Sequence, residues 1–200
     1  MSIAPRRLPR QRRSRETVSI LVEAAAQVFS REGLAATTNR IAERAGVSIG
    51  TLYQYFPDKY AVLRAVAERH VSEAGTRLGE VFAELRRTEP PFEEAMAAIV
   101  EVVVDLHRDR PVLHGLMHRL APRDARDLAA MRAFEDHLAE EITYHLVRCG
   151  RGGADPALAA RTVVHGVDSH LHRVLVYGSV DARQVTELVY RLLGESGGRS

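Results

Sequence analysis

Residues 48–59 carry several hydrogen-bonding side chains on a short segment that has little to offer a hydrophobic core. Leu52 and Phe56 lie four residues apart and can face inward from a helix over residues 49–55. The other positions of this helix present small, hydroxyl, amide and aromatic groups, on Gly50, Thr51, Tyr53, Gln54 and Tyr55. Such a face suits the major groove of DNA, because it allows close backbone approach, hydrogen bonds to phosphates and contacts with base edges.

A second short helix is predicted immediately before this one. Residues 39–45 place Ile41 and Ala45 on one face, as a helix that packs on a core requires. Gly46 follows at a position where helices favour a residue that tolerates positive φ. Ser48 is then a suitable N-cap for the next helix. The pattern predicts two short helices joined by a tight turn.

A longer helix is predicted over residues 15–31, where apolar side chains recur at helical spacing until Gly33. Either Thr37 or Thr38 can cap the following helix, and we expect Thr38 both to cap it and to lie near a phosphate. These three helices define a DNA-binding helix-turn-helix unit over residues 15–60.

The charge of the chain is unevenly distributed. Residues 1–60 contain ten basic and five acidic residues, whereas residues 61–200 contain eighteen basic and twenty-one acidic ones. A basic front and a mildly acidic remainder indicate that only the front meets a polyanion. The first 15 residues contain six arginines, two prolines and no acidic residue, so we expect residues 1–14 to form a disordered basic arm.

The rest of the chain is also predicted to be helical. Apolar positions at a period near 3.6 recur through it, separated by proline and glycine breaks. The expected helices cover about residues 58–87, 92–108, 110–120, 124–148, 156–177 and 181–193. The fold class is therefore all-α with about nine helices, in which residues 61–195 form a second, helical domain and residues 196–200 a disordered tail.

Composition excludes several other classes of protein. The single cysteine, Cys149, forbids an intramolecular disulfide and fits a reducing cytoplasm. We expect a cytoplasmic protein without a membrane partner, because no run of about 18 uncharged apolar residues occurs. Nucleophile-elbow, phosphate-loop and dinucleotide-binding motifs are absent, so we expect neither an enzyme nor a bound cofactor.

The helix-turn-helix segment closely resembles that of the TetR family of bacterial repressors. Residues 41–59 match the family pattern I-A-x-x-A-G-V-S-x-G-T-L-Y-x-Y-F-x-x-K without a gap, and the resemblance covers roughly residues 15–65. It implies that Ser48, Thr51, Tyr53, Tyr55 and Lys59 contact DNA. Ile49 and Gln54 stand where the family pattern varies, so they are candidates for setting sequence preference. With Thr38 and Gly50, these residues complete the predicted DNA-binding set.

The same resemblance implies a homodimer that binds a near-palindromic DNA operator and is released by a small molecule of unknown identity. The last two long helices form the family's dimer interface, and here they carry wide apolar faces. The predicted interface residues are Val163, Val167, Leu171, Val174, Leu175, Val185, Leu188, Val189 and Leu192. The predicted ligand-binding residues mix apolar and polar groups: Met96, His107, Leu113, Leu116, Met117, Phe134, His137, His165, Asp168 and His172.

The histidines do not predict a metal site. His114 and His118 share a helix face, but His107 lies beyond the break at Pro111, and His172 shares no face with its neighbours. Three alternatives to the repressor remain open. They are an activator of the same fold, a DNA-binding protein without an inducer, and a protein-interaction module with a vestigial helix-turn-helix.

Overall fold

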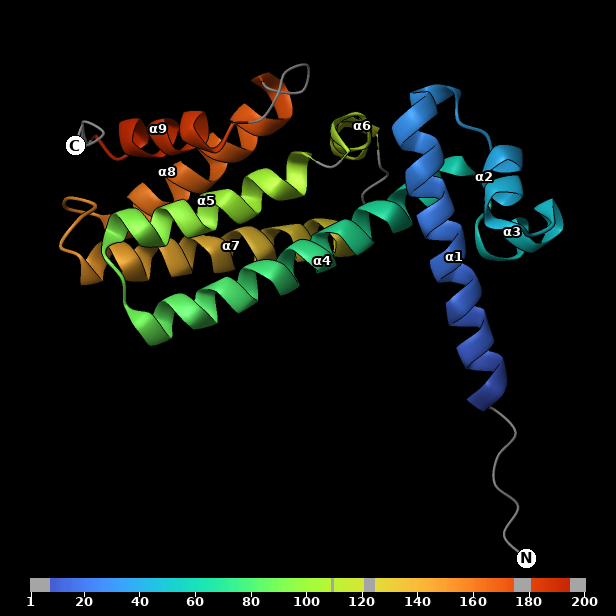
Figure 1. Cartoon of the computed structure of the whole chain (residues 1–200), viewed down its shortest axis with the longest axis horizontal. Helices are drawn as coiled ribbons and strands as arrows, with labels where there is room; N and C mark the ends of the chain where they lie inside the picture. The colour runs from blue at the N-terminus through green and yellow to red at the C-terminus, as the bar shows by residue number, and fades with distance from the viewer. Residues whose placement is uncertain (1–7, 109, 121–124, 175–180, 195–200) are drawn as a thin grey trace, which may run out of the picture. The chain divides into compact units, whose positions relative to one another are not determined.

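The computed structural model describes residues 8–108, 110–120, 125–174 and 181–194. Over these residues the chain forms nine α-helices and two short helical turns, with no strand (Figure 1). The prediction of an all-α fold is confirmed. The helices are α1 Leu8–Glu32, α2 Thr38–Ala45, α3 Ile49–Tyr55, α4 Lys59–Thr88, α5 Phe92–Arg108, α6 Pro111–Leu120, α7 Ala125–Arg148, α8 Pro156–Ser169 and α9 Ala182–Leu192. The 3-10 turn η1 spans Gly33–Ala35 and the π-helical turn η2 spans His170–Val174.

The chain divides into two compact units. The N-terminal unit comprises the residues up to Glu68 together with a segment that begins at Leu116. The C-terminal unit begins at Arg69 and contains the rest of the chain. The boundary therefore falls inside α4, about two helical turns beyond the residue 60 expected from the sequence. The apolar side chains of Val62, Leu63 and Val66 still belong to the first core.

The N-terminal unit is built from α1, α2, α3 and the first part of α4. Helix α2 packs against both α1 and α3 (Figure 1). The core of the N-terminal unit is made of fully buried aliphatic and aromatic side chains: Leu21, Ala25, Phe29, Ile41, Leu52 and Val62. Polar contacts fix α2 on α1 as well, since Arg40 pairs with Glu32 at 2.9 Å and Arg44 Nε donates to Gln27 at 2.7 Å. These contacts hold the two short helices in a defined position.

Helix α1 begins at Leu8 rather than at the predicted Arg15. Pro9 does not prevent this, because proline is tolerated in the first turn of a helix, where its missing N–H would have no partner. Helix α1 thus includes residues 8–14 of the predicted arm. Residues 1–7 of the predicted arm, and the whole of the predicted C-terminal tail, lie outside the described residues.

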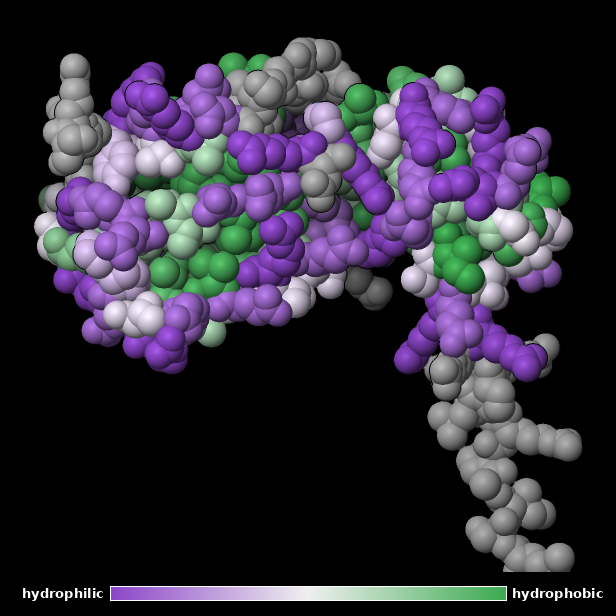
Figure 2. Space-filling model, in the orientation of Figure 1, coloured by the Kyte–Doolittle hydropathy of each residue, from purple (hydrophilic) through white to green (hydrophobic). Residues whose placement is uncertain are grey.

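The C-terminal unit is a bundle of the second part of α4 with α5, α7, α8 and α9. Helix α5 packs against α7 and α9, and α8 packs against the same two helices. The core of the C-terminal unit includes Phe82, Phe92, Ile99, Leu146 and Val185. Hydrophilic side chains cover the outer surfaces of these helices, and a hydrophobic band shows between α4 and α5 (Figure 2). Among the described residues, no helix combines the length and the hydrophobicity that a bilayer crossing demands.

Helices α8 and α9 turn much of their apolar surface toward this core rather than outward. Val163, Leu171, Val185 and Val189 are at most 4% exposed within the single chain. Within the single chain the bundle itself covers these four predicted interface side chains, so little of their surface is left for a partner. The outward or half-buried members of the predicted interface are Val167, Val174, Leu188 and Leu192, and Leu175 lies outside the described residues.

Candidate nucleic-acid interface and histidine cluster

The turn between α2 and α3 is fixed by its own local hydrogen bonds. Gly46 ends α2 with a φ of 68°, the left-handed conformation that glycine adopts without strain. Ser48 Oγ accepts a hydrogen bond from the Thr51 backbone N–H at 3.0 Å and so caps α3. The Ser48 and Thr51 hydroxyls also lie 2.8 Å apart. The predicted helix-turn-helix and its Ser48 cap are therefore present.

Helix α3 divides sharply into a buried and an exposed side. Leu52 is fully buried and Phe56, which follows the helix, is 8% exposed. Tyr53 is 52% exposed and Ile49 37%, and Ser48, Gly50 and Gln54 are exposed as well. Thr51, Tyr55 and Lys59 are half-buried. The structure thus presents most of the predicted DNA-binding set on one open surface of the N-terminal unit.

Gly50 has no packing reason to be glycine. A Cβ built at this position would meet only Ser48 Oγ, at an ordinary contact distance of 3.7 Å. Its φ is not positive either, so an alanine would fit the backbone and would favour the helix. The absence of a side chain here matches a surface that another molecule approaches closely.

Of the two threonines that could cap α2, Thr37 does so and Thr38 does not. Thr37 is the N-cap, with its Oγ1 accepting from the Arg40 backbone N–H at 3.3 Å. Thr38 is the first helical residue, so the expectation that it caps α2 is wrong. Its hydroxyl lies 3.1 Å from the Tyr53 hydroxyl instead. This pair joins α2 to α3 at the exposed surface and leaves both hydroxyls with further hydrogen-bonding capacity.

Lys59 is held by the protein itself. Its ammonium group donates to the backbone carbonyls of Leu34, at 2.8 Å, and Ala36, at 3.3 Å. These carbonyls belong to the segment that links α1 to α2, so Lys59 ties the start of α4 to the base of the helix-turn-helix. Asp58 caps α4 beside it, accepting from the N–H groups of Tyr60 and Ala61 at 2.8 Å each.

A second group of functional side chains lies in the C-terminal unit. His107 at the end of α5, His114 in the first turns of α6 and His172 in η2 each bring one ring nitrogen within 4.8 Å of the others. His107 Nε2 and His172 Nε2 lie 3.2 Å apart. His70 of α4 packs edge-on against His114, with ring centroids separated by 4.3 Å. The predicted ligand-binding set includes neither His70 nor His114, because four separate elements bring these rings together.

Burial favours the neutral form of His70, His107 and His114. It lowers the pKa of His70 and of His107 to about 4 and that of His114 to about 2, from an ordinary value of 6.5. Neighbouring imidazoles add to the effect, since a charge on one ring would disfavour a charge on the next. The carbonyl of Val103 and the carboxylate of Asp168 oppose it at His107.

We therefore expect acid to destabilise the protein in a defined range of pH. A histidine whose pKa is lower in the folded than in the unfolded chain stabilises the fold only while it is neutral. Its contribution is complete above pH 6.5 and is lost as the pH falls toward 4. Urea denaturation in the presence of a chelator should give a free energy of unfolding that is lower at pH 5 than at pH 7, by on the order of 1 kcal/mol per histidine.

The variant His70→Phe should reduce this pH dependence, whereas His165→Gln, at an exposed position on α8, should preserve it. Equal stability of the wild-type protein at pH 5 and pH 7 would contradict the expectation.

The remaining predicted ligand-binding residues do not share one location. Asp168 lies with the cluster, because its carboxylate is 2.9 Å from His172 Nδ1. Met96 is part of the main core, and Leu116 and Met117 belong to the N-terminal unit. His137 and His165 are exposed. The half-buried Phe134 packs against the main core, and Leu113 is buried next to His114 in the chain.

Both units match known family models. Residues 21–66 match the model of bacterial regulatory proteins of the tetR family, and residues 91–193 match that of the tetracyclin repressor-like C-terminal domain. A comparison with curated proteins found no match to the chain.

Solved structures share the fold over nearly the whole chain. A TetR-family transcriptional regulator from Streptomyces coelicolor is 21% identical, with a TM-score of 0.71 over 89% of this chain and 79% of that one. A TetR/AcrR-family regulator from Thermobifida fusca is also 21% identical, with a TM-score of 0.68 over 92% of this chain and 100% of that one. The transcriptional regulator FadR from Bacillus subtilis, in complex with stearoyl-CoA, is 19% identical, with a TM-score of 0.66 over 88% and 97%.

The model of the C-terminal domain alone covers more than half of the chain, and the model of the DNA-binding domain covers the helix-turn-helix. The chain belongs to the TetR family of bacterial transcriptional regulators.

Proposed function

We propose that the protein is a homodimeric repressor that binds a palindromic operator through α3 and leaves it when a small molecule binds in the C-terminal unit. The observation that carries this proposal is the outer face of α3. It is exposed, rich in hydrogen-bonding groups and occupied at its centre by Gly50, a glycine that no contact within the unit requires. Close approach of a DNA backbone and base edges supplies the missing reason.

The short length of the DNA-contacting helix α3 supports a dimer. Helix α3 has seven residues, so one copy can contact only a few base pairs. Two copies placed one helical turn of DNA apart, or a multiple of it, would read a near-palindrome. In the family, the last two long helices form the interface. On α8, η2 and α9 the exposed or half-buried apolar side chains that remain for this role include Leu158, Val167, Val174 and Leu188.

Release by a small molecule requires a connection between the units. Helix α4 supplies one, because it is continuous from Lys59 in the N-terminal unit to Thr88 in the C-terminal unit. A coupling free energy of about 1–3 kcal/mol between the two sites suffices to change operator affinity about 5- to 150-fold. The complex of FadR with stearoyl-CoA supports the binding of a small molecule by a protein of this fold.

Transcription from a reporter gene tests the regulatory role. A reporter placed behind the chain's own upstream DNA should fall in activity when the protein is expressed. It should recover on addition of an inducing compound, with a panel that begins with stearoyl-CoA. Increased reporter activity would favour an activator of the same fold. Repression that no compound relieves would favour a DNA-binding protein without an inducer.

The variant Tyr53→Phe should weaken operator binding about tenfold with little change in stability. Among the described residues the phenol hydroxyl has one hydrogen-bond partner, Thr38, at an exposed position, so its loss costs the fold little. One hydrogen bond to a phosphate is worth about 1.5 kcal/mol or more, because the acceptor is charged. Fluorescence anisotropy with a labelled operator measures the change. Tyr60→Phe, an exposed tyrosine in α4, is the matched control, and equal losses in the two variants would contradict a specific role for Tyr53.

A further inference from the structure

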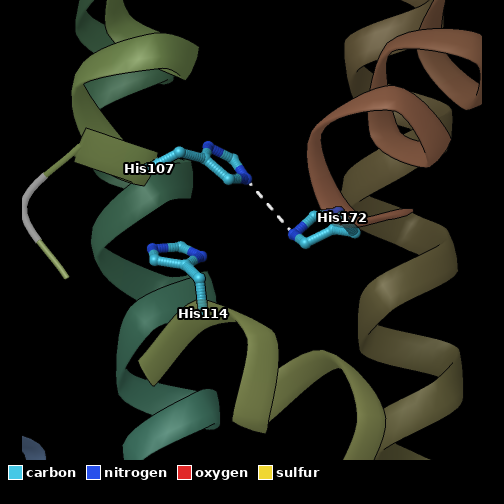
Figure 3. A group of neighbouring side chains, drawn as sticks. All are labelled: His107, His114 and His172. Carbon is cyan, nitrogen blue, oxygen red and sulfur yellow. Dashed lines mark hydrogen bonds between the residues drawn. The ribbon is translucent and has the colours of Figure 1, made fainter. Parts of the chain in front are cut away.

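The histidine cluster is composed of side chains from three elements that converge within the C-terminal unit. His107 lies at the C-terminal end of α5, His114 in α6 and His172 in the π-helical turn η2. Figure 3 shows the rings of His107 and His172 pointing toward one another, with the His114 ring beside them. His114 is 7% exposed and the other two side chains are half-buried. Bulk water therefore has limited access to the nitrogens.

Each ring has one nitrogen committed to an oxygen acceptor. His107 Nδ1 lies 2.7 Å from the carbonyl oxygen of Val103, and His114 Nε2 lies 2.7 Å from that of Leu106. His172 Nδ1 lies 2.9 Å from an Asp168 carboxylate oxygen and 3.0 Å from the Asp168 carbonyl oxygen. Carbonyls and carboxylates only accept, so these nitrogens carry the ring protons.

The assignment of the protons determines what the opposite nitrogens offer. In the neutral rings, His107 Nε2, His172 Nε2 and His114 Nδ1 each present a lone pair. Histidines bound to metals show this same arrangement, in which the second N–H is donated to a carbonyl or a carboxylate that fixes the ring. Asp168 is the carboxylate of this set.

Two lone pairs that face each other at 3.2 Å need a positive charge between them. A proton between the two nitrogens would have to leave a charge on one of two half-buried imidazoles. A metal ion supplies the charge without protonating either ring. Zinc–nitrogen bonds of about 2.0–2.1 Å in a tetrahedral site place two ligand nitrogens roughly 3.3 Å apart, close to the separation found here.

We propose that His107, His114 and His172 bind one divalent transition-metal ion, with Zn²⁺ as the ion that their geometry fits. Imidazole ligands favour zinc, cobalt, nickel or copper over magnesium and calcium, which prefer oxygen. One ring nitrogen of each histidine lies within 4.8 Å of the others, so the His114 ring closes on the other two by up to about 1.5 Å when the ion binds. The fourth coordination position is left for water or for an oxygen atom of a small molecule.

The π-helical turn supports the proposal independently of the distances. Short π turns interrupt α-helices frequently at functional sites. Here the turn begins at His170, directly after α8, and it contains His172. The same segment buries Leu171 in the core, which anchors the backbone directly before the imidazole of His172. His70, stacked edge-on against His114, covers that ring from α4.

Titration of the tag-free, full-length protein with Co²⁺ tests the site, after removal of bound metal with a chelator. We expect one Co²⁺ per chain, with the strong visible absorption of a four-coordinate cobalt site, and displacement of this signal by Zn²⁺. His107→Gln and His172→Gln should each weaken binding at least 100-fold. Asp168→Asn, which changes a positioning residue and not a ligand, should weaken it about 10- to 100-fold.

His165→Gln is the matched control, because this histidine is exposed on α8 and has no part in the cluster. It should bind Co²⁺ as the wild-type protein does. Circular dichroism must show that every variant is folded, and His107→Asn replaces His107→Gln if the latter unfolds. The proposal is overturned if Co²⁺ does not bind stoichiometrically or if folded variants at positions 107 and 172 bind it unchanged. DNA binding measured in chelator is a separate result, so either proposal can fail alone.

Discussion

Gly50→Asp should abolish specific operator binding while making the protein slightly more stable. The position lies in the first turn of α3, where a carboxylate interacts favourably with the helix N-terminus by roughly 0.3–1 kcal/mol. Replacing glycine within a helix adds a further gain in helix propensity. No atom of the unit obstructs a Cβ. Against DNA the same carboxylate would face phosphates, and a like-charge contact of this kind costs several kcal/mol.

The two effects have opposite signs, which makes the prediction specific. We expect at least a 100-fold loss of operator affinity by fluorescence anisotropy, together with an unchanged or raised free energy of unfolding in urea. Gly75→Asp is the matched control, because Gly75 is an exposed helical glycine of the C-terminal unit, also with open space around it. If Gly50→Asp bound the operator as well as the wild-type protein does, α3 would not be the recognition helix.

Leu52→Ala should destabilise the protein by about 2–5 kcal/mol, the usual range for a buried leucine. Leu52 is the only fully buried residue of α3, so its side chain supplies most of what holds this short helix on the N-terminal core. A seven-residue helix has no stability of its own. Urea denaturation followed by circular dichroism measures the loss.

Ile49→Ala serves as the comparison on the same helix, because Ile49 is 37% exposed. We expect it to cost less than about 1 kcal/mol. Similar losses for the two variants would mean that α3 is not anchored through Leu52.

The helix-turn-helix could be predicted from the sequence because local chemistry determines it. The left-handed conformation at Gly46 and the cap at Ser48 depend on residues within a few positions of each other. The four-residue spacing of Leu52 and Phe56 likewise determines which side of α3 is buried. The start of α1 was misplaced because a proline can equally well precede a helix or occupy its first turn.

Tertiary packing explains what the sequence did not reveal. An apolar face on α8 or α9 has the same pattern whether it packs on its own bundle or on a partner, and Val163 and Val185 pack on their own bundle. The histidine cluster was hidden for a related reason. Pro111 interrupts the helical phase between His107 and His114, and η2 changes the phase of His172, so no periodic pattern links the three rings.

Footprinting on the chain's own upstream DNA tests the central claim most directly. Wild-type protein and Gly50→Asp are compared across a range of salt concentrations, in the presence of a chelator. The account predicts protection of a short, nearly palindromic segment by the wild-type protein and none by the variant. Uniform coating that disappears steeply with salt, and that is the same for both proteins, would contradict it, because binding would then come from charge alone.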